Sequence, residues 1–354
     1  MNHTTKQPGY ILVLTIMVLA IAVAIVSHLF YRGSVQVAFD KTIIEREKAK
    51  QLAFGGIQLA LSQLSVLDTS TTTTQNEKSS NIDPLIESIK KIVPQLNVWQ
   101  ELSLTKEKEG IDGEIKLCIV CENGKIDINQ WFDFSKKKFI NEGSKDQPDA
   151  KKIMQIIFAG MKKFTNDKDL FEVFEKFLKQ RQYKLNDISE LFEIPEFAKI
   201  FKTTLFYEPP QKGDEKTKRP LFLSDVFTIF SGQAALQAWL LSDSILGVLN
   251  FNRANPNREK RAKEVEALLK DYSKGMQPMQ LWQKAMQTLY GKEMKDIPKE
   301  ALAMLNPKFE PTVFSVLCYG KVGAIVQKIC AIIEKRKTTE LNGAPFAIKR
   351  LYWL

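Results

Sequence analysis

The feature that most constrains this chain is an apolar run close to its start. Over residues 10–31 the sequence contains no Asp, Glu, Lys or Arg, and its polar side chains include Thr15, Ser27 and His28. As a helix that rises ~1.5 Å per residue, this run is roughly 30 Å long, which matches the hydrocarbon thickness of a bilayer. The run therefore predicts one membrane-spanning helix.

The helical pattern continues beyond the membrane run. No proline occurs between Gly9 and Leu64, and apolar or small residues recur every three or four positions on one helix stripe: Leu52, Ala53, Gly56, Ile57, Ala60, Leu61 and Leu64. We expect one unbroken helix over residues 10–64, apolar on every side in its first half and amphipathic in its second. Because small side chains let helix backbones approach, Ala53, Gly56 and Ala60 predict contacts with the helices of neighbouring subunits.

The residues before the run carry a second signal. A polar leader of eight residues ends at Gly9, and the apolar run begins directly at Tyr10. This arrangement resembles the prepilin-type leader of type IV pilins and type II secretion pseudopilins, which a prepilin peptidase cuts after the glycine. The resemblance implies processing between Gly9 and Tyr10. The fifth mature position, Glu in most members, is Leu14 here, a departure shared with the K-type pseudopilins (general secretion pathway protein K).

Other interpretations of the N-terminal segment stay open. Residues 20–22 (Ala-Ile-Ala) are similar to a signal-peptidase site, and an ordinary signal anchor fits the same run. Lys6 alone precedes the run, whereas five basic residues follow it: Arg32, Lys41, Arg46, Lys48 and Lys50. The positive-inside rule would keep that second flank in the cytoplasm, so a cytoplasmic domain on an inverted anchor is a further alternative.

Composition argues against an enzyme and against a nucleic-acid-binding surface. The formal charge of the 354 residues is +10, and lysines are spread among glutamates, as on a solvated surface. The only histidines, His3 and His28, lie in the leader and the membrane run, which excludes histidine-based acid–base, triad and metal chemistry elsewhere. The sequence has neither Gly-x-Ser-x-Gly nor a P-loop. We expect no catalytic residues and no nucleic-acid partner.

Four cysteines are present: Cys118, Cys121, Cys318 and Cys330. The pair Cys118 and Cys121 has no second pair or nearby histidine to complete a zinc site. On a strand, two residues three apart point to opposite faces, which disfavours a local disulfide. We expect buried free thiols, and a disulfide formed outside the cytoplasm stays open.

The rest of the chain predicts strands, then helices, then strands. We expect a flexible linker over 65–82, a helix over 84–92, and a hairpin of 114–121 and 125–129 around Asn123-Gly124. From 150 to 306 the apolar residues recur at the period of a helix, and the phenylalanines among them are expected to face the core. One expected helix spans 225–230 and is capped by Ser224. Further helices are expected at 153–164, 170–178, 188–192, 234–241, 259–272, 280–289 and 298–305.

The C-terminal part predicts a second hairpin and a closing strand. Residues 313–319 and 324–334 flank a turn that we centre between Lys321 and Val322, which pairs Cys318 with Ile325. Residues 346–353 form the closing strand. The expected domains are a leader (1–9), the helix (10–64), the linker (65–82), a pilin-like part (83–141), an inserted helical domain (142–308) and strands completing the sheet (309–354). The fold class is thus α+β, with an antiparallel sheet.

Three short segments strengthen the resemblance to the K-type pseudopilins. Residues 124–129 resemble the family's Gly-Lys-Ile-Asn-Leu-Asn segment, and residues 223–232 resemble its helix leading into a glycine. Residues 249–254 resemble its Ile-Asn-Ile-Asn-Thr-Ala segment, with Arg253 replacing Thr. The asparagines in these segments also suit caps of turns between sheet and helices.

The resemblance implies a non-enzymatic minor pseudopilin anchored in the inner membrane, with its C-terminal domain in the periplasm. Its implied partners are prepilin peptidase, other minor and major pseudopilins, and possible secreted cargo. Because Leu14 offers no carboxylate to a neighbouring amine, the chain suits a filament tip. Calcium is associated with the family, but no acidic cluster here matches a ligand set, so no metal site is assigned. A minor pilin of a DNA-uptake or adhesive pilus and a membrane-anchored cytoplasmic scaffold are the alternatives.

Overall fold

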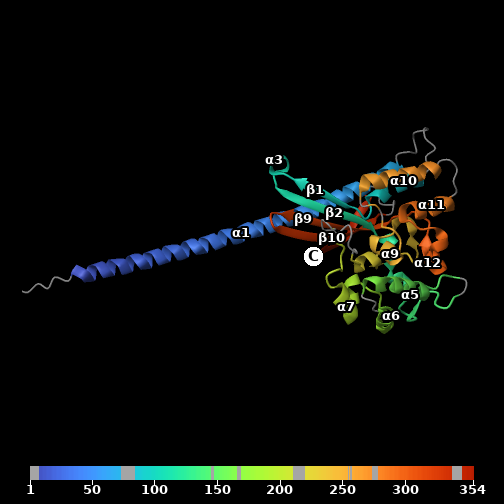
Figure 1. Cartoon of the computed structure of the whole chain (residues 1–354), viewed down its shortest axis with the longest axis horizontal. Coiled ribbons are helices and arrows are strands. Elements are labelled where there is room, and N and C mark those ends of the chain that lie inside the picture. Colours follow the sequence, from blue (N-terminus) through green and yellow to red (C-terminus); the bar gives the residue numbers. More distant parts are fainter. Residues whose placement is uncertain are drawn as a thin grey trace, which may run out of the picture.

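A single long helix dominates the molecule. The computed structural model describes residues 8–72, 84–144, 147–165, 169–209, 220–253, 255, 257–272, 278–336 and 345–354. Helix α1 (Pro8–Thr72) contains 65 residues and extends roughly 97 Å at ~1.5 Å per residue. It projects far beyond the remaining elements, which form a head around its C-terminal part (Figure 1). The expectation of one unbroken helix is confirmed.

Helix α1 is longer than its sequence pattern predicted. The expected linker began at Ser65, yet the helix continues to Thr72, so the first eight residues of that segment are helical. The remainder of the expected linker, 73–82, lies outside the described residues. The linker was predicted from the threonine-rich composition after Leu67. The apolar residues Val66 and Leu67 lie before that stretch and continue the apolar character of the helix sequence.

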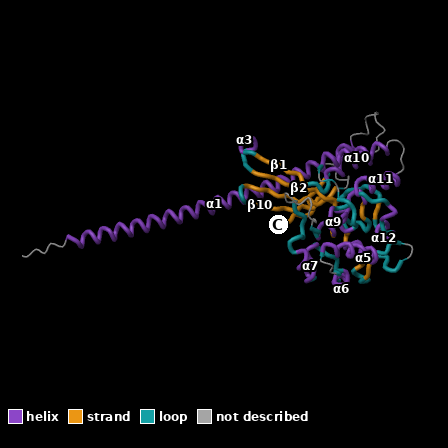
Figure 2. Tube along the Cα trace, in the orientation of Figure 1, coloured by secondary structure: helices purple, strands orange, loops and turns teal. Residues whose placement is uncertain are grey.

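The head is built on one antiparallel sheet. Its strand order is β1 (Trp99–Leu104), β2 (Gly113–Cys121), β9 (Val313–Val322), β10 (Ile325–Lys335) and β11 (Phe346–Trp353). The C-terminal half of α1 lies along this sheet (Figure 2). The expected closing strand over 346–353 is confirmed, and it pairs with β10 at the sheet edge.

One face of the sheet meets α1, and alternation along β2 explains why. Ile115, Leu117, Ile119 and Cys121 belong to the core that includes the α1 stripe, as the two-residue period of a strand requires. Cys118 belongs to a second apolar cluster on the opposite face, with Tyr207 and Cys330 among its members. The sheet is therefore covered on both faces.

The elements between β2 and β9 form a mainly helical insertion, as expected. Its longer helices are α5 (Ala150–Met161), α6 (Phe171–Gln180), α10 (Arg258–Tyr272) and α11 (Pro278–Tyr290). The shorter helices are α4 (Ile128–Trp131), α7 (Pro195–Phe201), α8 (Leu223–Val226), α9 (Asp243–Val248) and α12 (Lys299–Ala303). The short strand pairs are β3 (Ile126–Asp127) with β6 (Phe227–Thr228), β4 (Phe132–Asp133) with β5 (Lys138–Phe139), and β7 (Leu236–Gln237) with β8 (Leu305–Asn306). Helix α2 (Pro84–Ile92) precedes the sheet, and α3 (Lys106–Glu109) joins β1 to β2.

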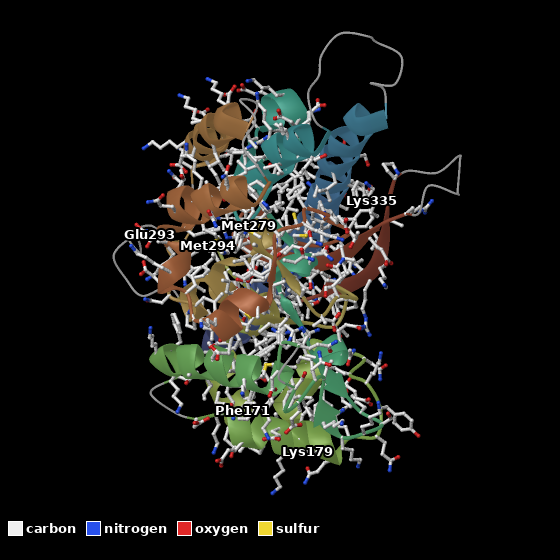
Figure 3. The ribbon with its side chains drawn as sticks, turned by 90° about the vertical axis from the view of Figure 1, so that its right-hand side faces the viewer. Phe171, Lys179, Met279, Glu293, Met294 and Lys335 are labelled. Carbon is white, nitrogen blue, oxygen red and sulfur yellow. The ribbon has the colours of Figure 1, made fainter. Side chains whose placement is uncertain are left out.

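Phenylalanines fill the core of the insertion, as their spacing predicted. The ring centroid of Phe174 lies 5.0 Å from that of Phe158, 5.7 Å from that of Phe227 and 6.1 Å from that of Phe197. The polar face of the same helix carries Lys179, which lies at the outer surface in Figure 3 and pairs with Glu175 at 2.7 Å. Charged residues on this helix thus occupy a solvated face.

The first expected hairpin is wrong. After β2 the chain enters a 3₁₀ turn (Glu122–Gly124), and β3 then pairs in parallel with β6 of the insertion instead of returning along β2. A Cβ atom at Gly124 would lie 1.8 Å from the carbonyl oxygen of Leu240, so the glycine serves a close backbone approach. The Asn-Gly pair satisfies both a hairpin and this contact, and sequence alone does not separate them.

The second expected hairpin exists with a different register. Val322 pairs with Ile325, so the turn falls at Gly323, whose φ is +58°, and Cys318 pairs with Ile329. The expectation placed the turn two residues too early and paired Cys318 with Ile325. Glycine tolerates the left-handed conformation, and this preference fixes the turn.

The helices expected over 225–230 and 234–241 are also wrong. Helix α8 ends at Val226, and Ser224 makes no capping hydrogen bond. The second segment contains β7 and a 3₁₀ turn (Ala238–Leu240). Residues 188–193 form a 3₁₀ helix rather than an α-helix. Residues 225–228 and 236–241 are buried, so their packing in the core overrides a weak local preference for helix.

Candidate functional site

The free half of α1, residues 10–44, is exposed on all sides. From Tyr10 onward, the first buried residue is Ala49. The segment Tyr10–Ser65 has an 18-residue window of mean hydropathy 2.8, none of it buried, so by length and composition it could cross a membrane. Three of its hydroxyl side chains bond to their own helix: Thr15 donates to the carbonyl of Ile11, Ser34 to that of Tyr31 at 2.8 Å, and Thr42 to that of Ala38 at 2.8 Å. Such internal bonding suits an apolar surrounding.

The residues expected at the processing and assembly positions lie at the far end of this free half. Gly9 lies in the first turn of α1, and the Tyr10 side chain is exposed. Leu14, one turn further on, is 52% exposed. The structure brings none of these three residues to the head. Their roles in cleavage and assembly remain predictions.

The small residues of the stripe have a different partner from the expected one. Ala53 and Ala60 are fully buried and Gly56 is buried, all in contact with the chain's own head. A Cβ atom at Gly56 would lie 2.1 Å from Sγ of Cys318 on β9. The assignment of these residues to contacts with neighbouring helices is therefore corrected, because their small size serves the approach of helix to sheet.

A second glycine confirms how close that approach is. A Cβ atom at Gly320 of β9 would lie 2.1 Å from the carbonyl oxygen of Ala49 and 2.5 Å from the backbone nitrogen of Ala53. The strand backbone thus passes directly over the helix backbone. Sequence reasoning treated Gly320 as a turn residue and did not assign it to this crossing.

A buried polar cluster connects the sheet to the insertion. The ammonium of Lys125 pairs with Glu122 and donates to Oγ of Ser315 on β9 at 3.1 Å. Glu122 also accepts a hydrogen bond from the hydroxyl of Thr228 on β6. These four residues are each at most 3% exposed. We call them, together with Asp225, the junction cluster.

The opposite charges of the junction cluster shift each other's pKa values toward the ionised forms. Burial alone would lower the pKa of Lys125, but the carboxylates of Glu122 and Asp225 outweigh burial, so the pKa is raised and the ammonium stays charged. Burial raises the pKa of Asp225, and Lys125 and the backbone N–H of Ser244 offset only part of that rise. An ion pair in such a position is costly to break, because the remaining charge would be buried alone.

The flanking residues extend this connection. Oδ1 of Asn123 accepts hydrogen bonds from the backbone N–H groups of Thr312 at 2.9 Å and Val313 at 3.1 Å. Oδ2 of Asp127 accepts from the N–H of Gly232 at 2.8 Å, and Oδ1 accepts from Asn129 at 3.0 Å. The segment 122–129, read from sequence as a turn and strand, is the joint between sheet and insertion. The spacing of an acid and a lysine at 122 and 125 was the available signal.

The four thiols are buried and none is bonded to another. Burial raises the pKa of Cys318 and of Cys330 to about 12, so both remain protonated and unreactive at neutral pH. Cys118 and Cys121 lie in different apolar clusters on opposite faces of the sheet, as expected. Among the described residues, no group of three His, Cys, Asp or Glu side chains could hold a metal ion.

Comparisons with solved structures show a likeness in fold. No protein-family model and no curated protein matches the sequence. Among solved structures, the chain is similar to one in the crystal structure of the GspK-GspI-GspJ complex from the type 2 secretion system of enterotoxigenic Escherichia coli. The two chains are 12% identical, the likeness covers 89% of this chain and 98% of the other, and the TM-score is 0.46.

Proposed function

We propose that this chain is a non-enzymatic minor pseudopilin of the K type, anchored in the inner membrane by α1 with its head in the periplasm. The observation that carries the proposal is the division of α1 into two parts. Residues 10–44 are exposed, and the first 22 of them (10–31) carry no charged side chain, whereas residues from Ala49 onward pack against the sheet. A helix of this kind leaves one half available to lipid or to other helices while the other half carries a folded head.

The free half is the assembly surface in this proposal. In the precursor its uncharged part, residues 10–31, lies in the membrane, and after cleavage between Gly9 and Tyr10 by a prepilin peptidase the free half packs among the helices of other minor and major pseudopilins. Leu14 provides no carboxylate for a neighbouring terminal amine, and an unpaired charge in lipid is costly. A subunit without that carboxylate suits the filament tip, where the insertion would contact partner subunits or secreted cargo.

Topology mapping of the full-length chain tests this proposal. Protease added to spheroplasts should degrade the head, since an extracytoplasmic domain becomes accessible once the outer membrane is opened. N-terminal sequencing of membrane-extracted protein should begin at Tyr10. A head protected in spheroplasts and degraded only after lysis, or a mature chain that begins at Met1, would contradict the proposal.

The distribution of basic residues on the two sides of the apolar run favours a second candidate, a membrane-anchored cytoplasmic scaffold. Arg32 and Lys41 follow the apolar run on the exposed helix, and the positive-inside rule places such a flank in the cytoplasm. Lys41 lies 3.8 Å from Glu45, but the rule counts basic residues and not net charge. The spheroplast experiment distinguishes the two candidates directly.

A further inference from the structure

A small cavity lies beside the ion pair of the junction cluster. Its volume is about 30 Å³, and polar groups from three parts of the fold line it: Glu122, Lys125, Tyr207, Ser224, Thr228 and Ser315. The cavity therefore lies where β9 of the sheet, the segment after β2 and helix α8 of the insertion meet.

Two groups on the cavity wall have hydrogen-bonding capacity left over. The buried hydroxyl of Ser224 has no partner among the described residues. The ammonium of Lys125 has three N–H donors, of which two are used by Glu122 and Ser315. The ring of Tyr207 also lies beside the ammonium, with its centroid 5.9 Å from Nζ. A buried hydroxyl without a partner destabilises the folded state, so a hydrogen-bonding occupant is favoured.

We propose that this cavity binds one or two water molecules, which accept a hydrogen bond from Lys125 and bond to the hydroxyl of Ser224. A water molecule needs roughly 10–15 Å³ of such space and two to four polar partners, both of which are present. Organic ligands occupy sites of roughly 300 Å³ or more, which excludes them here. The Lys125 ammonium and the Glu122 carboxylate form an ion pair with each other, so neither charge is left over to bind an ion.

The bound water connects parts of the chain that are distant in sequence. Ser224 belongs to the insertion, whereas Lys125 is held to β9 by Ser315. A water between them continues the polar joint that Thr228 and Glu122 begin. The water is thus a structural component that fixes the insertion on the sheet.

A crystal structure of the full chain in detergent, at a resolution that shows ordered water, tests the proposal. We expect a density peak within hydrogen-bond distance of both Nζ of Lys125 and Oγ of Ser224. An empty cavity, a cavity closed by side-chain movement, or a larger or ionic occupant would overturn the proposal.

A pair of serine variants isolates the role of the hydroxyl. In Ser224→Ala the peak should be lost or should shift away from position 224, because one of its partners is gone. In the control Ser88→Ala, whose hydroxyl lies on α2 beside a different groove, the peak should keep its place. A peak that is unchanged in Ser224→Ala would show that Ser224 does not bind the water, and would refute the proposed bridge.

Discussion

Single residues decide how closely α1 and the sheet approach. Gly55 and Gly56 are adjacent in sequence but differ in surroundings: a Cβ atom at Gly55 meets nothing within 4 Å, whereas one at Gly56 would overlap Cys318 and Ile115. The same substitution should therefore have opposite effects at the two positions.

We predict that Gly56→Ala destabilises the full chain by about 1–3 kcal/mol, the usual cost of overpacking a core. Gly55→Ala should stabilise it by about 0.4–1 kcal/mol, because alanine restricts the unfolded chain and fits a helix. Urea unfolding in detergent measures both. Equal effects of the two variants would mean that Gly56 does not lie against β9.

Asp187 provides a pH-dependent link between the insertion and the sheet edge. Its carboxylate accepts hydrogen bonds from Ser189 and from the hydroxyl of Tyr352 on β11 at 2.8 Å, and Arg350 lies 3.4 Å away. Partial burial raises the pKa of Asp187, but the hydrogen bonds from Ser189 and Tyr352 and the charge of Arg350 outweigh burial, so the pKa is lowered.

A lowered carboxyl pKa means that the folded state binds fewer protons than the unfolded state, so stability rises with pH across that window. The contribution of Asp187 is present above the ordinary pKa of 3.8 and is lost as the pH falls through the lowered value. We predict that Asp187→Asn costs about 1 kcal/mol at pH 7 and progressively less below pH 3.8. A cost independent of pH would exclude this ionic contribution.

At the scale of elements, α1 has one surface that is covered by the sheet and another that is exposed. The stripe that contains Ala53 and Ala60 is covered by the sheet, and the free half is uncovered on every side. In the proposed function, assembly through α1 uses the free half, because the small residues of the stripe are covered by the chain's own sheet.

Photo-crosslinking in membranes separates the two surfaces. A photoreactive residue at Val37, which is 68% exposed, should crosslink to other membrane-embedded subunits when the secretion genes are expressed together. A photoreactive residue at Phe54, which is 40% exposed and lies on the head-bearing half, is the control and should give little intermolecular product. Stronger intermolecular crosslinking from position 54 than from 37 would contradict the division of α1.

At the scale of the whole molecule, the junction cluster makes sheet and insertion one body. Lys125 and Glu122 contact β6 and β9 at once, so the ion pair lies where the two parts meet. The insertion leaves the sheet at Cys121 and returns at Val313, and both ends lie close to this cluster.

We predict that Lys125→Met destabilises the full chain by about 3–5 kcal/mol, since it leaves the Glu122 carboxylate buried and unpaired. Adding Glu122→Gln should restore part of the loss, because the uncompensated charge is then removed. Unfolding free energies of the two single variants and the double variant measure the coupling. A double variant whose loss equals the sum of the single losses would show that the pair does not interact.

The spacing of apolar residues along the sequence was enough to predict the long helices and strands, in which that spacing repeats several times. The unbroken helix follows from a proline-free apolar run and its stripe, and the strand β2, the helices α5, α6, α10 and α11, and the closing strand follow from clear periods. Leu14 and Tyr10 also stand out from sequence alone, because their significance depends on position relative to Gly9.

Only the tertiary structure decided what the small and polar residues contact. Gly56 and Gly320 could each serve a turn, a helix partner or a close crossing, and only the packing of α1 on β9 selects the last. The sequence predicts a strand that begins at Lys125, and only the packing of the insertion on the sheet buries Lys125 and Glu122 together. Periodicity records which face of an element is apolar, whereas the partner of that face depends on contacts between residues far apart in the chain, which no local pattern encodes.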